Sequence, residues 1–177
     1  MGIHIADVTH FLEAFSPLDC EVSERANTVY MVDNVYHMLP KQLCLTCSLL
    51  PGHDKLAFSV ILEMTVDGEI VSHRFAKTVI NSCCQMSYEQ AQCMIDDKDC
   101  SYDWEKDGSL KIFNGYKPRD LWKVVQDLYD FAVKLRTKRF NEGALRIDQP
   151  KLCVFLDNVT KLPASYTIEE RKESNRY

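Results

Sequence analysis

The sequence predicts an α+β fold, with a mixed, mainly antiparallel sheet and packed helices. One observation is a pair of strand-like segments, residues 56–66 and 69–81, joined by Asp67-Gly68. An Asp-Gly pair between two such segments is a strong signal for a β-hairpin. The other observation is a run of apolar residues after Pro118 with the i, i+3, i+4, i+7 spacing of an amphipathic helix. Its members are Leu121, Val124, Val125, Leu128, Phe131, Ala132 and Leu135.

The N-terminal part is expected to hold a strand, a short helix and a loop. Residues 3–12 begin by alternating apolar and polar side chains, as a half-buried strand does. Residues 18–27 are predicted to form a short helix with apolar side chains at every fourth position. A short apolar run follows at 29–32, and we expect residues 41–52 to be a loop that ends at a Pro-Gly pair.

A second helix is expected in the middle of the chain. Ser87 is a good N-cap for a helix over residues 88–95, and Gln90 completes a capping box of the Ser-x-x-Gln form. Residues 96–117 hold five aspartates, two glycines and few aliphatic side chains. This composition favours a surface loop.

The long helix and three further strands are expected toward the C-terminus. Pro118 suits the first turn of the helix, and Gly143 lies where a C-terminal stop is expected. Cations in the last turn oppose the helix dipole, and here they are Lys134, Arg136, Lys138 and Arg139. The strands are predicted at residues 144–148, 151–157 and 164–169.

Size and charge limit the classes of protein to consider. At 177 residues the chain fits one domain with a substantial core. The net charge of −5 argues against broad electrostatic binding of nucleic acid. The sequence shows neither a long apolar run nor a secretory signal, so we expect no membrane partner and a cytoplasmic location.

Eight cysteines are expected to act as reduced thiols that pack like small hydrophobic side chains. A disulfide framework is not indicated because no secretory signal accompanies them. Cys44 and Cys47 have the spacing of a zinc knuckle, with His37 and His53 nearby. A zinc site normally shows two such ligand pairs, so a small zinc-binding protein is the less favoured alternative.

Several ordered segments resemble the RNB catalytic domain of the RNase II and RNase R family. They occur in family order along the whole chain, 1–177. They are residues 2–11 (GIHIADVTHF), 25–30 (RANTVY), 38–40, 47–49, 54–60 (DKLAFSV), 77–82 (KTVINS), 87–92 (SYEQAQ), 142–148 (EGALRID) and 170–176 (ERKESNR).

This resemblance implies part of a 3′→5′ exoribonuclease, a hydrolase that degrades RNA with Mg²⁺ as cofactor. The expected partner is the 3′ end of single-stranded RNA, and no DNA partner is expected. The details are most similar to the eukaryotic Dis-three-like branch, which implies cytoplasmic mRNA decay without exosome association. A non-catalytic module that binds RNA or protein is the main alternative.

The resemblance places the metal ligands outside this chain. The family's aspartate cluster lies upstream of the segment matching Gly2, and a glutamate pair follows the segment matching Arg176. The chain is therefore expected to be a partial RNB domain, and we assign it no catalytic and no metal-binding residue. Isolated, it is expected to be inactive. Asp7 alone does not replace a cluster, because Mg²⁺ is usually held by one or two carboxylates together with substrate phosphates.

Two tyrosines are predicted to contact RNA. Tyr30 matches the family tyrosine that stacks on the 3′-terminal base, a role that suits an aromatic ring because every base has a π-face. Tyr88 matches a second family aromatic near the RNA. The alternative for both is that the ring packs within the protein.

Two arginines complete the predicted RNA-binding set. Arg146 lies in the segment that flanks the RNA channel in the family and would contact backbone phosphate. Arg25 could meet a phosphate or a buried carboxylate such as Asp19, and the internal pair is favoured. Ile147 stands where bacterial relatives have a phenylalanine that clamps the terminal base with the tyrosine.

Overall fold

A computed structural model describes residues 1–145, 151–157, 159–160, 162–169 and 174. Contacts between residues divide the chain into two compact units. The first unit is formed by residues 1–5 together with the segment that begins at Leu49 and includes the long helix. The second contains residues 6–48 and the C-terminal pair of strands.

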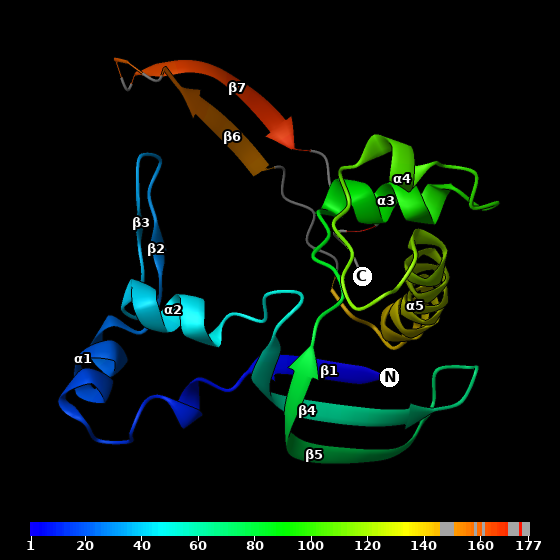
Figure 1. Ribbon diagram of the computed structural model, residues 1–177, viewed down its shortest axis with the longest axis horizontal. Helices are drawn as coiled ribbons and strands as arrows, with labels where there is room; N and C mark the ends of the chain where they lie inside the picture. The colour runs from blue at the N-terminus through cyan, green and yellow to red at the C-terminus, as the bar shows by residue number, and fades with distance from the viewer. Residues whose placement is uncertain (146–150, 158, 161, 170–173, 175–177) are drawn as a thin grey trace. The chain divides into compact units, whose positions relative to one another are not determined.

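The first unit contains a three-stranded sheet with the order β1 (Gly2–Ala6), β4 (Asp54–Met64) and β5 (Ile70–Asn81) (Figure 1). β4 and β5 are antiparallel, so the hairpin expected from Asp67-Gly68 is confirmed. Gly68 has φ of +87°, and its N–H donates to the Thr65 carbonyl over 3.0 Å. Its lack of a Cβ allows this left-handed conformation. The strand expected over 3–12 ends at Ala6.

One buried polar group links the three strands. Ser59 of β4 is fully buried, and its hydroxyl lies 2.7 Å from Nδ1 of His4 and 2.5 Å from the hydroxyl of Thr78. His4 belongs to β1 and Thr78 to β5. Because a buried hydroxyl without a partner is costly, these contacts fix the faces on which the three strands present their side chains.

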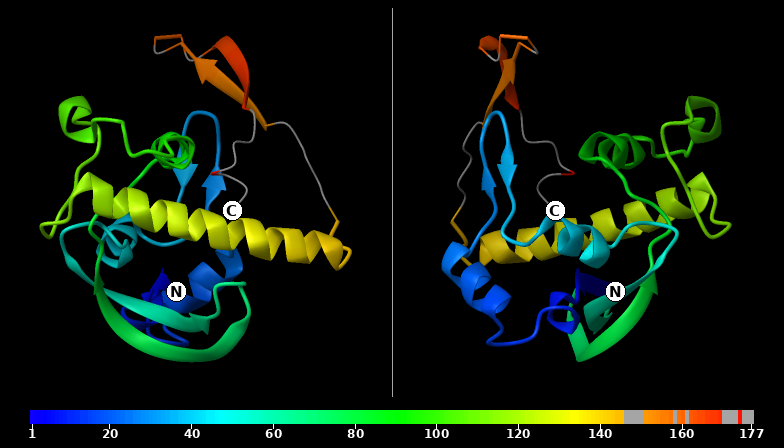
Figure 2. Two further views of the ribbon diagram at one scale, coloured as in Figure 1. Left: turned by 90° about the vertical axis from the view of Figure 1, so that its right-hand side faces the viewer. Right: turned by 60° about the vertical axis from the view of Figure 1, so that its left-hand side comes forward.

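Three helices complete the first unit: α3 (Tyr88–Asp96), α4 (Trp104–Asp107) and α5 (Pro118–Asn141). The predicted capping box is confirmed, because Ser87 Oγ accepts from the Gln90 N–H and Gln90 Oε1 accepts from the Ser87 N–H. Pro118 lies in the first turn of α5, as expected, and α5 runs as one unbroken helix (Figure 2). Among the described residues, no helix combines the length and the apolar character needed to span a bilayer.

The core of this unit joins α3, α4 and α5. Its buried side chains are Met94, Trp104, Leu110 and Leu121. The expectation of a surface loop over 96–117 was therefore wrong in part, because Trp104 and Leu110 fold into the core. The count of aliphatic residues missed the contribution of one large aromatic side chain, which buries more area than any aliphatic one.

The remaining acidic loop is held by Asp97. Its carboxylate accepts hydrogen bonds of 2.9 Å from the Ser101 N–H, the Ser101 hydroxyl and the Tyr102 N–H. Its backbone carbonyl accepts from Trp122 Nε1 of α5 over 2.6 Å. The bonds from Ser101 and Tyr102 stabilise the charged carboxylate and lower its pKa.

The second unit is built from short elements. They are η1 (Val8–His10), α1 (Pro17–Arg25), β2 (Val29–Tyr30), β3 (Val35–Tyr36), α2 (Lys41–Cys47), β6 (Lys151–Leu156) and β7 (Pro163–Glu169). β6 and β7 are antiparallel, which confirms the last two predicted strands. In the strand expected over 144–148, Ala144 and Leu145 belong to no strand, and the other positions lie outside the described residues.

Two elements of the second unit were not expected. Residues 41–47 form helix α2 where a loop was predicted. Pro40 precedes it, and Lys, Gln and Leu in its first turn are good helix formers, so local propensity outweighed the Pro-Gly signal at 51–52. The apolar run at 29–32 is also half of a hairpin, in which β2 pairs with β3.

We predict that Leu121→Ala destabilises the first unit by about 2–5 kcal/mol, because Leu121 is only 7% exposed in the core. Leu128→Ala on the same helix is the matched control, since Leu128 is 46% exposed and should cost less than about 1 kcal/mol. Urea unfolding followed by circular dichroism compares the two variants. Equal losses would show that the core is not centred on Leu121.

We also predict that Asp97→Asn lowers the melting temperature at pH 7. A carboxylate with a lowered pKa contributes stability above its ordinary pKa of 3.8, and this contribution is lost as the pH falls through the lower folded value. The difference between wild type and variant should therefore shrink below about pH 4. Thermal melts between pH 7 and 3, with exposed Asp127→Asn as control, test this. A difference that is constant with pH would contradict it.

Candidate nucleic-acid interface

Tyr30 lies on the β2–β3 hairpin of the second unit. The pair is short, with Val29 opposite Tyr36 and Tyr30 opposite Val35. In Figure 1, β2 and β3 project as a narrow pair of strands beside α1 and α2. Tyr30 is 77% exposed, so its ring is not held in a core. A ring presented in this way is free to stack on a planar partner.

The turn of this hairpin is closed by Asn34. The Met31 N–H donates to the Asn34 carbonyl over 2.9 Å, and the Asn34 side-chain oxygen accepts from the Val35 N–H. Asp and Asn are frequent turn residues because their side chains bond nearby backbone groups. Asp33-Asn34 between two Val-Tyr pairs was thus the signal that could have predicted this hairpin.

Arg25 lies at the base of the same hairpin, in the last turn of α1. Its Nη1 donates to the backbone carbonyls of His37 and Met38, at 3.1 and 3.4 Å, and its Nη2 lies 2.5 Å from Glu21 Oε1. The carboxylate partner is therefore the exposed Glu21, so the expectation of a buried partner such as Asp19 was wrong. Asp19 instead accepts from the Phe15 N–H over 2.9 Å. The i, i+4 spacing of Glu21 and Arg25 was the available signal.

Tyr88 is the first residue of α3 in the other unit and is 61% exposed. Its backbone carbonyl accepts from the hydroxyl of Ser174 over 2.9 Å, and the Ser174 N–H donates to Gln92 Oε1 over 2.9 Å. These bonds tie α3 to Ser174, the one described residue between 170 and 176. Arg146 and Ile147 lie outside the described residues, so their predicted roles stay predictions.

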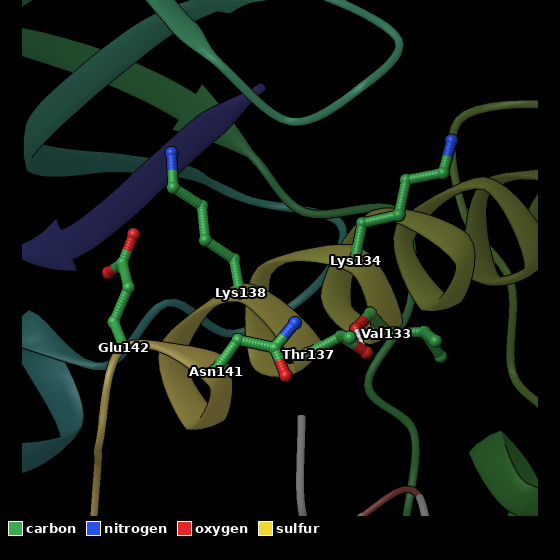
Figure 3. A pocket seen from close by; sticks show the side chains of 6 residues that line it. All are labelled: Val133, Lys134, Thr137, Lys138, Asn141 and Glu142. Atoms are coloured by element: carbon green, nitrogen blue, oxygen red, sulfur yellow. Dashed lines mark hydrogen bonds between the residues drawn. The ribbon is translucent and has the colours of Figure 1, made fainter.

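The basic end of α5 is engaged with the β4–β5 turn. Lys134 Nζ donates to the Val66 carbonyl over 2.7 Å, and Lys138 Nζ lies 2.7 Å from Glu69 Oε1. The bond to Glu69 raises the pKa of Lys138. Figure 3 shows both lysines extending from α5, beside a groove of about 460 Å³. Two of the four cations at this helix end therefore bind a turn that is distant in sequence.

The described carboxylates do not fit a magnesium site. Asp7 is buried and accepts from the Thr9 hydroxyl over 2.5 Å. In the acidic loop, Asp97 binds loop groups and Asp103 accepts from the Lys106 N–H at the start of α4. Across the part of the chain that the structure describes, no three His, Cys, Asp or Glu side chains are placed to hold a metal ion together. The proposed zinc ligands likewise form no such group there.

No disulfide joins any of the eight cysteines, all of which lie among the described residues, and the buried packing expected of them is found for only part of the set. Cys47 on α2 is buried, Cys20 is exposed and the other six are half-buried. Cys83, Cys84 and Cys93 pack against the core of the first unit. Burial raises the pKa of Cys84 and Cys93, and nearby charged groups add to the effect. These thiols are therefore protonated near neutral pH and act as packing groups.

The family model described as "RNB domain" matches residues 1–177. DIS3-like exonuclease 2 of Xenopus tropicalis is 41% identical over 177 residues, which cover 99% of this chain and 21% of that protein. A protein of Arabidopsis thaliana named inactive exonuclease DIS3L2 is 35% identical over 176 residues, covering 99% of this chain and 16% of that protein. The chain thus spans about a fifth of the length of the Xenopus relative and about a sixth of the length of the Arabidopsis one.

The fold also occurs in a solved structure. Mycoplasma genitalium RNase R in complex with ribose methylated single-stranded RNA superimposes with a TM-score of 0.81 and 18% sequence identity. The match covers 99% of this chain and 25% of that one, and it supports the α+β fold. Since the family model and the sequence relatives both match almost every residue, the chain belongs to the RNB domain family.

Proposed function

We propose that this chain is part of a 3′→5′ exoribonuclease and forms one wall of its RNA-binding site. The observation that carries the proposal is the RNB family match along all 177 residues. The names of the sequence relatives support it, since the first of them are called exonucleases. The substrate proposed for the complete enzyme is the 3′ end of single-stranded RNA.

Tyr30 is the proposed contact with the terminal base. Its exposed ring stands on a hairpin held at both ends by hydrogen bonds, so the ring is presented without a core around it. Stacking would tolerate any base, as an enzyme that removes successive nucleotides requires. Tyr88 is a second proposed aromatic contact, and Arg146 a proposed phosphate contact that positions RNA without reading its sequence.

Mg²⁺ is the proposed metal of the complete enzyme. The described residues do not form a site for Mg²⁺, so we propose that its ligands come from other residues of the complete enzyme. We further propose that the complete enzyme works in cytoplasmic mRNA decay without the exosome. The similarity to relatives named DIS3-like exonuclease 2 supports this branch of the family.

A non-catalytic RNA-binding module is the second candidate. It is favoured by the Arabidopsis relative that is named inactive. The two candidates differ in one property. Both should bind single-stranded RNA when metal is chelated, but only the first should shorten RNA when Mg²⁺ is present in the complete protein.

The test uses the complete protein that carries this chain. A 5′-labelled single-stranded RNA should be shortened progressively from its 3′ end in the presence of Mg²⁺, and EDTA should stop the reaction. A circular RNA of the same sequence should survive because it has no end. Binding without shortening would favour the non-catalytic module, and cleavage of the circle would contradict an exonuclease.

We predict that Tyr30→Ala weakens binding of a single-stranded RNA 3′ end by about 1–3 kcal/mol, because one base loses its stacking partner. Tyr30→Phe keeps the ring and should bind nearly as wild type. Exposed Tyr116→Ala is the control for loss of a surface aromatic. Fluorescence anisotropy with 5′-labelled RNA in EDTA measures the affinities. Unchanged affinity of Tyr30→Ala would remove Tyr30 from the interface.

A further inference from the structure

The β2–β3 hairpin is too small to be stable without help. It has two residue pairs, Val29 with Tyr36 and Tyr30 with Val35, and all four of these side chains are exposed. An isolated two-stranded hairpin is marginally stable in water even when it is longer. The orientation of the Tyr30 ring must therefore be fixed at the base of the hairpin, where the chain enters and leaves.

Two connections close that base. Thr28 precedes β2, and its hydroxyl accepts from the Met38 N–H over 3.0 Å. Arg25 reaches the same segment after β3, donating to the carbonyls of His37 and Met38. Met38 is thus held through its N–H by Thr28 and through its carbonyl by Arg25.

Glu21 holds the guanidinium in place for this role. It lies one turn before Arg25 on α1, and its carboxylate binds Nη2 while Nη1 faces the two carbonyls. A planar guanidinium can serve both directions at once because its donors form a rigid fork. A lysine has a single nitrogen on a flexible stem and would have to choose between the carboxylate and the carbonyls.

We propose that Arg25 is a positioning residue, which fixes the base of the β2–β3 hairpin and so orients the Tyr30 ring for stacking on RNA. The inference rests on the proposed function, in that Tyr30 meets the RNA. It assigns Arg25 no contact with RNA, because its donors already face Glu21 and the carbonyls of His37 and Met38. The role proposed for Arg25 therefore differs from that of Arg146, which is proposed to contact an RNA phosphate.

The variants for the test are Arg25→Gln, Arg25→Lys and Glu21→Gln in the complete protein, with exposed Arg119→Gln on α5 as the matched loss of one positive charge. Hydrogen exchange measured on peptides that cover residues 28–38 reports the order of the hairpin. Affinity for 5′-labelled single-stranded RNA in EDTA reports how the order of the hairpin affects RNA binding. Arg25→Gln should speed exchange in this segment several-fold. It should weaken RNA binding by roughly three- to tenfold, which is a smaller loss than that expected for Tyr30→Ala, where the stacking ring itself is removed.

Arg25→Lys should lie between wild type and Arg25→Gln, and Glu21→Gln, which keeps both carbonyl bonds, should have the smaller effect. In a Tyr30→Ala background, Arg25→Gln should cause little further loss, because it acts through the ring. A phosphate contact would behave differently. If Arg25 contacted a phosphate, Arg25→Gln would weaken RNA binding in the Tyr30→Ala background as well. It would also reduce the slope of log K for RNA binding against log salt concentration by about 0.7.

The outcomes separate this inference from the proposed function. Wild-type exchange of residues 28–38 in Arg25→Gln and Arg25→Lys would overturn the inference, whatever RNA binding does. Persistent loss in the Tyr30→Ala background with a reduced salt dependence would overturn it in favour of a phosphate contact. Faster exchange together with normal binding by Tyr30→Ala would instead overturn the role of Tyr30 in the proposed function.

Discussion

The pairing of β4 with β5 is the constraint on which the first unit depends. The register runs from Asp54 opposite Asn81 to Met64 opposite Ile70, and it fixes which side chains share a face. Ser59 then meets Thr78 on one side and His4 of β1 on the other. A slip of one residue would turn all of these side chains to the opposite face and leave a buried hydroxyl without partners.

The far end of the hairpin holds the long helix. Lys134 and Lys138 of α5 bind the turn through the Val66 carbonyl and the Glu69 carboxylate, on either side of Asp67-Gly68. Both contacts are at the surface and each contributes little alone. Their importance is geometric, because they join the turn of the sheet to the same helix that buries Leu121.

The second unit is not organised around a packed core, since few of its described side chains are buried and its elements are short. Its local order comes from caps and side-chain hydrogen bonds, such as those of Ser16, Thr28 and Asn34. A hairpin organised in this way can expose an aromatic ring, whereas a packed core would bury it. This exposure supports the proposal of Tyr30 as an RNA contact even though the chain as a whole is acidic.

Local chemistry in the sequence was sufficient for several elements. Asp67-Gly68 specified a hairpin turn, Ser87 and Gln90 specified a capping box, and Pro118 marked the start of α5. Each involves groups within a few residues of each other, so no distant contact is needed. The ordered RNB segments likewise identified the family. Among the candidate site residues, the sequence predicted Tyr30 as an RNA contact and favoured a carboxylate of the same chain as the partner of Arg25.

Tertiary structure alone decided the contacts between distant segments. It placed Trp104 in the core, directed Lys134 and Lys138 to the β4–β5 turn, and brought Arg25 to the carbonyls of His37 and Met38. Backbone carbonyls are present at every residue, so sequence cannot show which one a distant cation will find. The partner is chosen by the path of the chain, and in the first unit that path is fixed only when the sheet and the core have formed.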